Sequence, residues 1–287
     1  MFNGIHVFRT CTGKDFLQMK EHAFSVFYPH LVAAMEQTGK SWEEVAAFVR
    51  TLDIHAVDIG LKDLTQKGVA ENLKQAGFEI TSVYVSCEFQ DDPENLIELD
   101  VINAAKKYGF NQVLVVPGML SDENPDALNN ILIGLQSFCK TCFEHNLTVV
   151  LEDYDFAEAP FGTSSQMLYF FNKVPGLKAC LDTGNFEYFG EDLQDAYERL
   201  RGRIVHVHCK DRTLVRPDAV YGSHAVDGRI LYPAAVGEGF LPIESIVKQL
   251  IADGYKGMFS IEHFGSPDML GDIQKSVRNL KKWIHNR

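Results

Sequence analysis

The stretch from residue 147 to residue 209, LTVVLEDYDFAEAPFGTSSQMLYFFNKVPGLKACLDTGNFEYFGEDLQDAYERLRGRIVHVHC, decides the fold. In it, short runs rich in β-branched and other apolar residues alternate with amphipathic segments of helical spacing. The runs are LTVVLE (147–152), LKACLD (177–182) and RIVHVHC (203–209), and the amphipathic segments are TSSQMLYFFNKV (163–174) and EDLQDAYERLRG (191–202). This alternation predicts a parallel β-sheet whose strands are connected by helices.

The same alternation continues in both directions and gives eight candidate strands. They are IHVF (5–8), HAVDIG (55–60), EITSVYV (79–85), NQVLVVP (111–117), LTVVLE (147–152), LKACLD (177–182), RIVHVHC (203–209) and GMFSIEH (257–263). Eight units in chain order fit a closed barrel better than an open doubly wound sheet, because no glycine-rich dinucleotide-binding fingerprint follows the first strand. We therefore predict an α/β fold, a single (β/α)8 TIM barrel that spans residues 1–287 as one domain.

Two connections between the candidate elements are too long to be plain turns. Residues 10–40 form an extended connection after the first strand, and we expect an extra helix there, around KDFLQMKEHAF or YPHLVAAMEQ. Residues 211–240 form a long loop after the seventh strand. Both connections follow strands, so both are expected at the C-terminal face of the barrel, where such enzymes carry their active sites.

Composition and charge narrow the classes of partner. The formal net charge of -12 opposes binding to a phosphate backbone, so we expect no nucleic-acid partner. The apolar runs have strand length, well short of the roughly 20 residues that span a bilayer, so we expect no membrane partner. The first residues, MFNGIHVFRT, lack the pattern of a signal peptide, and six sparse cysteines suit a reducing compartment. These features predict a cytoplasmic protein.

Four of the later candidate strands end in a side chain that can bind a metal. The strand ends read VVL-Glu152, ACL-Asp182, VHV-His208 and FSI-Glu262. An unpaired buried carboxylate costs several kcal/mol, whereas three carboxylates and an imidazole around one divalent cation stabilise each other. Such a donor set suits Mn²⁺, Co²⁺, Zn²⁺ or Mg²⁺. The alternative is that these carboxylates only cap helices or pair with lysines.

The strings LEDYDFAEAP, LDTGNF, HVHCKDR, AVGEGFLPIESIVKQL and FSIEHFG resemble, in that order, motifs of the xylose isomerase-like barrels. This superfamily of sugar phosphate isomerases and epimerases includes tagatose and psicose 3-epimerases, hydroxypyruvate isomerase, inosose dehydratase and, distantly, endonuclease IV. The motifs cover the C-terminal half of the chain, and the N-terminal half is similar only in general pattern. The resemblance implies metal ligands at Glu152, Asp182, His208 and Glu262. It also implies that Glu152 and Glu262 exchange a proton with the substrate.

The resemblance further implies residues that bind substrate. Arg212 resembles an arginine that holds substrate hydroxyls, and Glu158 matches a glutamate near the metal site. Asn185 stands where the epimerases carry a histidine, which puts 3-epimerisation itself in doubt. Lys210 either positions a substrate oxygen or forms a salt bridge at the barrel rim. His206 is expected to be a hydrogen-bonded core histidine rather than a support for the metal site.

The resemblance implies a divalent-metal-dependent isomerase or epimerase of a sugar or related polyhydroxy carbonyl compound, acting through a metal-stabilised enediolate. A dehydratase of the inosose or dehydroshikimate type would use the same metal and base. An endonuclease acting at abasic DNA is disfavoured, because the extra histidines of its three-metal cluster are missing. A binding protein without turnover is disfavoured by the two retained glutamates. The partner is therefore a small sugar-like molecule, and the resemblance implies a possible homo-oligomer.

Overall fold

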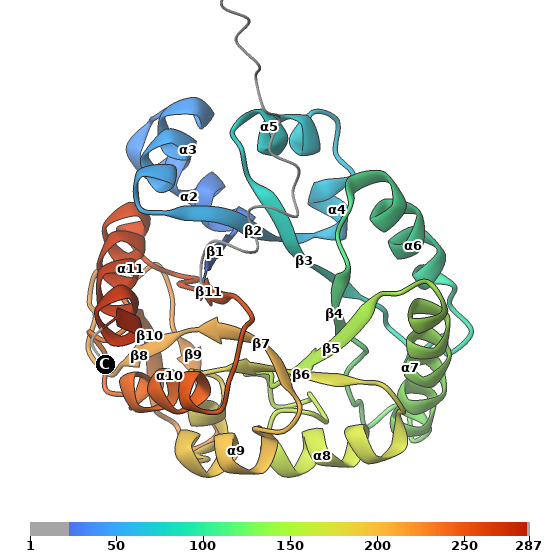
Figure 1. Cartoon of the computed structure of the whole chain (residues 1–287). Helices are drawn as coiled ribbons and strands as arrows, with labels where there is room; N and C mark the ends of the chain where they lie inside the picture. The colour runs from blue at the N-terminus through green and yellow to red at the C-terminus, as the bar shows by residue number, and fades with distance from the viewer. Residues whose placement is uncertain (1–22, 286–287) are drawn as a thin grey trace, which may run out of the picture.

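The protein folds into a closed barrel of eight parallel strands surrounded by helices (Figure 1). The computed structural model describes residues 23–285. The barrel strands are β1 (Phe24–Phe27), β2 (Ile54–Gly60), β3 (Glu79–Ser86), β4 (Gln112–Val116), β5 (Thr148–Glu152), β6 (Lys178–Asp182), β7 (Ile204–Cys209) and β11 (Phe259–Ile261). Around the barrel they follow the order β1-β11-β7-β6-β5-β4-β3-β2, so the predicted (β/α)8 TIM barrel is confirmed. The assignment of the whole chain to one domain stays a prediction.

The first barrel strand lies elsewhere than the sequence pattern indicated. The expected strand IHVF (5–8) lies outside the described residues, and FSVF at 24–27 closes the ring by pairing with both β2 and β11. Helix α2 (Tyr28–Thr38) follows β1 directly, with a proline in its first turn. The extra helix expected around YPHLVAAMEQ is therefore confirmed, and the connection from β1 to β2 contains two helices, α2 and α3 (Trp42–Thr51).

The remaining helices follow the strands along the chain, the last of them after β11, and cover the outside of the barrel (Figure 1). They are α4 (Leu61–Leu64), α5 (Val69–Gln75), α6 (Ile97–Tyr108), α7 (Ala127–Glu144), α8 (Ser164–Lys173), α9 (Leu193–Leu200), α10 (Ile243–Ala252) and α11 (Met269–His285). Helices α3 and α8 begin with capping boxes, in which Ser41 and Thr163 accept the backbone N–H of the third helical residue. None of the helices within residues 23–285 is long and apolar enough for a membrane span.

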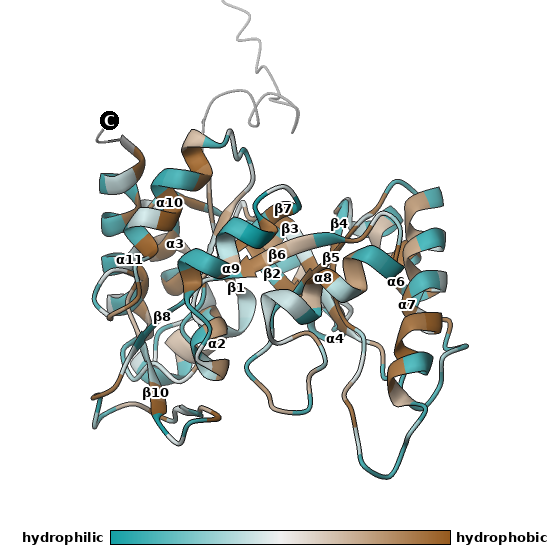
Figure 2. Ribbon diagram, turned by 90° about the horizontal axis from the view of Figure 1, so that it is seen from below, coloured by the Kyte–Doolittle hydropathy of each residue, from teal (hydrophilic) through white to brown (hydrophobic). Residues whose placement is uncertain are grey.

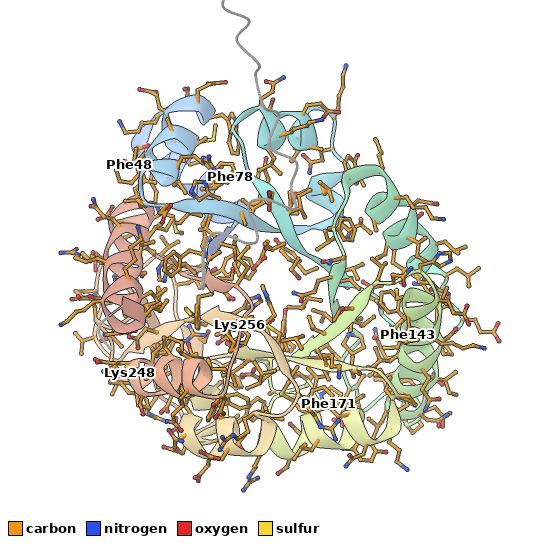
Figure 3. The ribbon with its side chains drawn as sticks, in the orientation of Figure 1. Phe48, Phe78, Phe143, Phe171, Lys248 and Lys256 are labelled. Atoms are coloured by element: carbon orange, nitrogen blue, oxygen red, sulfur yellow. The ribbon has the colours of Figure 1, made fainter. Side chains whose placement is uncertain are left out.

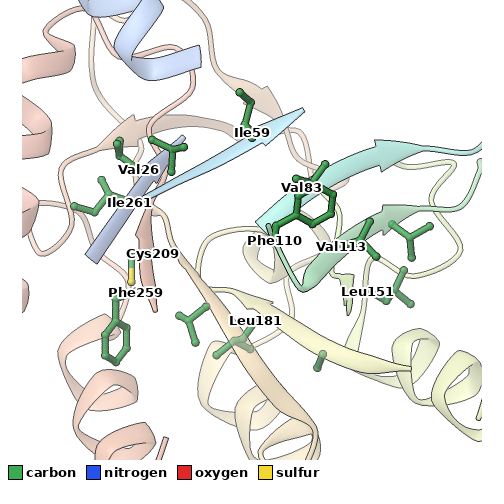
Figure 4. Close-up of a cluster of buried hydrophobic side chains, with 14 of the residues drawn as sticks. Val26, Ile59, Val83, Phe110, Val113, Leu151, Leu181, Cys209, Phe259 and Ile261 are labelled. Carbon is green, nitrogen blue, oxygen red and sulfur yellow. The ribbon is translucent and has the colours of Figure 1, made fainter. Parts of the chain in front are cut away.

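The main hydrophobic core lies between the strands and the helices. Outward-facing strand residues such as Val26, Ile59, Val83 and Leu181 are buried there (Figure 4). The apolar faces of the helices turn toward this layer, and their hydrophilic faces point outward (Figure 2). Side chains fill the space between the two shells, whereas Lys248 lies on the outer surface (Figure 3). This packing holds the strands in place, so that their ends can present a site.

The inside of the barrel is a separate and smaller layer. Successive residues of a strand point to opposite faces, and Leu114, Val150 and Cys180 form an apolar cluster in the interior. The next inward-facing positions on β5 and β6 are Glu152 and Asp182. The alternation of the strands therefore directs these two carboxylates to the C-terminal mouth of the barrel.

The long loop predicted after the seventh strand contains a small antiparallel sheet. Its strands are β8 (Asp211–Thr213), β9 (Ser223–His224) and β10 (Ile230–Ala234), in the order β8-β10-β9. Arg216 anchors the loop: its guanidinium contacts the buried Asp272 of α11 at 2.7 Å and donates to the Pro233 carbonyl at 2.8 Å. The loop is therefore a structured part of the barrel mouth.

A buried histidine pair makes the stability of the protein depend on pH. His30 Nε2 accepts the backbone N–H of His263 at 2.7 Å, which requires this nitrogen to be unprotonated. Burial lowers the pKa of His30 to about 3 and that of His263 to about 4. An unfolded histidine titrates near pH 6.5, so below this pH the unfolded state binds protons that the native state does not. The free energy of unfolding should fall with pH by about 1.4 kcal/mol per unit for each such histidine.

Urea denaturation at intervals between pH 7.5 and 5 measures this slope. The variant His30→Gln keeps a hydrogen-bond acceptor but cannot titrate. Between pH 6.5 and 5, its free energy of unfolding should therefore fall less steeply than that of the wild type, by about 1.4 kcal/mol per pH unit. Equal slopes for the wild type and this variant would show that His30 does not carry the effect.

Candidate metal centre

Four side chains from neighbouring strands meet at the mouth of the barrel. Glu152 and Asp182 are the last residues of β5 and β6, His208 lies near the end of β7, and Glu262 follows β11. These strands are consecutive in the barrel, and Asp182 and Ser260 both pair in register with His208. One possible ligand atom from each of the four side chains lies within 4.8 Å of all the others. The convergence expected from the strand ends is therefore present.

The four side chains are buried and in contact with one another. The Nδ1 atom of His208 contacts an Oε atom of Glu152 and lies 3.3 Å from Oε2 of Glu262. Asp182 and His208 are 0% and 1% exposed, and Glu152 and Glu262 are 8% and 5% exposed. A buried group of three carboxylates and one imidazole therefore offers several oxygen atoms and one nitrogen atom to the same small space.

Lys210 supplies positive charge to this group. Its Nζ atom lies 3.1 Å from Asp182 Oδ2 and 2.5 Å from Glu262 Oε1, and it donates to Asn185 Oδ1 at 2.8 Å. The Lys210 ammonium and a protonated His208 together balance only two of the three buried carboxylates. The excess negative charge and the mixed oxygen and nitrogen donors fit a divalent cation held by Glu152, Asp182, His208 and Glu262.

Two of the carboxyl groups have pKa values that shift in opposite directions. Burial would raise the pKa of Glu262, but Lys210 and His208 outweigh it and hold that pKa well below its usual range. Burial raises the pKa of Asp182 to about 8, and Lys210 only partly opposes this effect. Glu262 is therefore ionised at neutral pH, whereas Asp182 needs further positive charge nearby to be ionised fully.

The turn after β6 fixes Asp182. Its Oδ1 atom accepts the backbone N–H groups of Gly184 and Asn185 at 2.7 and 3.0 Å. A Cβ atom at Gly184 would lie 2.8 Å from a side-chain carbon of Lys210, so the close approach of these two segments requires glycine. Asp153 accepts the backbone N–H of Asp182 at 2.9 Å from beneath. Sequence analysis missed Asp153, although the unusual pair of acidic residues at the end of β5 could have indicated it.

Three of the predicted substrate-binding residues form a row beside the four. Asn185 is 2% exposed, and its Oδ1 atom accepts from Lys210 and, at 3.4 Å, from Arg212. Arg212 is held by Asp155, whose Oδ2 atom accepts from Nη2 at 2.6 Å. Glu158 lies apart from this row: its side chain is exposed in the loop after β5, and its role in binding substrate stays a prediction.

The interior below the site contains two further polar residues. His206 is buried in the barrel interior and contacts Asp58, at 3.1 Å between Nε2 and Oδ2, so the expected hydrogen bond of this interior histidine is present. Sequence analysis did not single out Asp58, although an acidic residue inside the apolar strand IHAVDIG is a signal of the same kind as the strand-end carboxylates.

Aromatic side chains from both ends of the chain line one side of the site. The Phe27 ring lies 4.8 Å from the His208 ring, between centroids, and 5.8 Å and 5.5 Å from the rings of Tyr84 and Phe264. Sequence analysis missed Phe27 because it placed the first strand at IHVF. The candidate site is thus polar on the β5 to β11 side and aromatic on the β1 side.

Solved structures with the same fold cover nearly the whole chain. A D-tagatose 3-epimerase-like protein superposes with a TM-score of 0.69 at 20% identity, over 92% of this chain and 97% of that one. A xylose isomerase-like TIM barrel protein from Mycobacterium smegmatis, in complex with magnesium, gives 0.68 at 16% identity, over 94% and 98%. A probable 3-DHS dehydratase from Bacillus anthracis gives 0.66 at 16% identity, over 91% and 98%. At these identities the likeness shows the fold.

Sequence comparison gives the family. Inosose dehydratase of Mesomycoplasma hyopneumoniae strain J is 27% identical over 167 residues, which are 51% of this chain and 54% of that protein. The chain spans about half the length of the curated relatives it matches. A family model described as xylose isomerase-like TIM barrel matches residues 32–283. The chain therefore belongs to the xylose isomerase-like TIM barrel family.

Proposed function

We propose that the protein is a divalent-metal-dependent isomerase or epimerase of a sugar or related polyhydroxy carbonyl compound. Glu152, Asp182, His208 and Glu262 would hold one cation, either Mn²⁺, Co²⁺, Zn²⁺ or Mg²⁺. The observation that carries the proposal is the convergence of these four buried side chains, within 4.8 Å, at the mouth of the barrel. Active sites of TIM-barrel enzymes lie at this face.

Glu152 and Glu262 would act as proton acceptor and donor. When bound, a divalent cation supplies Lewis-acid chemistry that acidifies a C–H bond next to a substrate carbonyl. Glu152 and Glu262 stand at the two ends of the row of four strands, with β6 and β7 between them. They can therefore face a substrate carbon from two sides, so that one removes a proton and the other returns one. Lys210 and His208 lower the pKa of Glu262, so its carboxylate is ionised before substrate binds.

The row beside the glutamates suits a polyhydroxylated substrate. Lys210 and Arg212 offer N–H donors, and Asn185 offers an amide in contact with both. Asp155 fixes the guanidinium of Arg212 with a contact of 2.6 Å, which lowers the entropic cost of orienting it toward a hydroxyl group. This arrangement supports a small-molecule substrate with several hydroxyl groups.

A dehydratase is the second candidate, and the sequence relatives favour it. The curated relatives in the sequence comparison are inosose dehydratases, and the match covers about half of each chain. In this reaction the same glutamate would remove a proton next to the carbonyl, and the hydroxyl on the adjacent carbon would leave as water after taking up a proton.

Turnover in deuterated water separates the two candidates. The protein loaded with Mn²⁺ is incubated with a panel of ketoses, aldoses and inososes, and the molecular masses of the products are measured by mass spectrometry. An isomerase or epimerase that exchanges its proton with solvent gives a product of the same composition with one deuterium at the reacting carbon, whereas a dehydratase gives a product lighter by one water. Failure to convert any member of the panel, by a protein shown to bind Mn²⁺, would count against both candidates.

A further inference from the structure

A buried carboxylate lies in the barrel interior, beneath the four side chains of the candidate metal centre. Asp58 is 1% exposed and belongs to β2, which is separated from β7 in the barrel by β1 and β11. Its side chain therefore reaches across the interior to the histidines of β7. Elsewhere in the interior, β4, β5 and β6 contribute the apolar cluster of Leu114, Val150 and Cys180. A charged residue is costly here unless it has a specific role.

The contacts of Asp58 orient its carboxylate toward the metal-site histidine. Its Oδ1 atom accepts the Thr81 hydroxyl at 2.5 Å, which anchors one end of the group. Its Oδ2 atom lies 3.1 Å from Nε2 of His206 and 3.6 Å from Nε2 of His208. Among residues 23–285, His208 Nε2 has no hydrogen-bond partner within the usual distance, so Asp58 Oδ2 is the acceptor that faces it.

The two nitrogen atoms of His208 face different environments. Nδ1 points to Glu152 and Glu262, and Nε2 points to Asp58. An imidazole that binds a metal must present an unprotonated nitrogen to it, and the hydrogen on its other nitrogen is then available to a neighbouring carboxylate. We propose that Asp58 is a positioning residue, which holds the hydrogen of His208 on Nε2 and leaves Nδ1 free to bind the cation. This inference rests on the proposed metal site.

His206 completes the arrangement. Its ring lies edge-on to the His208 ring, with centroids 5.1 Å apart, and it shares the Oδ2 atom of Asp58. The histidine at 206 thereby fixes the carboxylate, and the carboxylate fixes His208. Asp58, His206 and His208 could also be viewed as a second set of metal ligands. His208 would then have to bind two cations, one through each nitrogen, and the metal stoichiometry distinguishes this arrangement from the one proposed.

Cobalt binding to the metal-free protein tests the inference without an assay of activity. The affinity and stoichiometry of Co²⁺ are measured by calorimetry, and the melting temperature of the metal-free protein is measured in parallel. The variants are Asp58→Leu, which removes the hydrogen-bond acceptor that faces His208, and Asp58→Asn, which replaces the carboxylate with a neutral amide that can still accept a hydrogen bond. The matched control is Ser82→Ala, since Ser82 pairs in register with Asp58 and is equally buried.

We expect one Co²⁺ per wild-type chain, and an affinity about 10- to 100-fold weaker in Asp58→Leu. The melting temperature of this variant should stay the same or rise, because a buried charge is removed. Asp58→Asn should lose less affinity, and Ser82→Ala should bind as the wild type does. A merely structural Asp58 would lower the melting temperature without changing the affinity of the folded protein.

Wild-type affinity in folded Asp58→Leu would overturn the inference, and if this variant does not fold, unchanged affinity in Asp58→Asn would do so. Two Co²⁺ ions per wild-type chain, reduced to one by either substitution, would also overturn it, because Asp58 would then be a ligand. A wild-type protein that binds no Co²⁺ would instead refute the proposed function.

Discussion

Glu262→Gln is expected to lower kcat by about 10³-fold while the protein stays folded. Glutamine has nearly the same shape as glutamate, but it cannot accept a proton and is a poorer metal ligand. The substitution also removes the carboxylate that lies 2.5 Å from Lys210, whose ammonium keeps its contacts with Asp182 and Asn185. The fold should therefore tolerate the change, and the loss should fall on the chemistry.

The measurement compares kcat and the melting temperature of this variant with those of the wild type and of Glu144→Gln. Glu144 is an exposed glutamate at the end of α7, so its substitution removes the same charge far from the site. Activity of Glu262→Gln within a few-fold of the control would exclude Glu262 as the proton-transfer group.

Removal of divalent metal should lower turnover by at least about 100-fold, and Mn²⁺ or Co²⁺ should restore it. Without a metal cation, three carboxylates share one buried space with the Lys210 ammonium and a protonated His208, and burial raises the pKa of Asp182 to about 8. A bound cation would relieve this repulsion, and because it would bind only the native state it should also raise the melting temperature.

The experiment treats the protein with a chelator, removes the chelator by gel filtration, and measures metal content, turnover and melting temperature before and after adding Mn²⁺. Ca²⁺ serves as a comparison, because it favours more oxygen ligands than this set provides. Full turnover in a preparation shown to be free of metal would contradict the role of the cation.

The sequence revealed the polar side of the site because of its local pattern. Glu152 and Asp182 each follow a short apolar run. A carboxylate at the end of a buried strand is costly unless it has a partner, so the sequence alone marks these two positions as candidates for a site. The barrel was likewise predictable, because each strand and helix repeats the same alternation. In these cases the information lies within about ten residues of the position concerned.

The parts that were missed depend on contacts between distant segments. The run FSVF at 24–27 is as short as IHVF at 5–8, and only its pairing with β11 identifies it as the strand that closes the barrel. Phe27 was missed for the same reason. Asp58 meets His206 across 148 residues of sequence, a contact that no local pattern contains.

Charge pairing at the site also depends on the fold. The sequence left two roles open for Lys210, a contact with a substrate oxygen and a salt bridge at the barrel rim. In the structure its Nζ atom lies against the carboxylates of Asp182 and Glu262 in the buried site. Glu158 was singled out through the resemblance alone. Its side chain is exposed in the loop after β5, and its role in binding substrate stays a prediction.

Diffraction from crystals grown with Mn²⁺, with data collected for anomalous scattering, tests the central claim most directly. The account predicts a single strong peak at the mouth of the barrel, about 2.0 to 2.5 Å from ligand atoms of Glu152, Asp182, His208 and Glu262, with His208 bound through Nδ1. A peak bound by other residues would contradict the account. So would the absence of any peak in crystals grown at a saturating concentration of Mn²⁺.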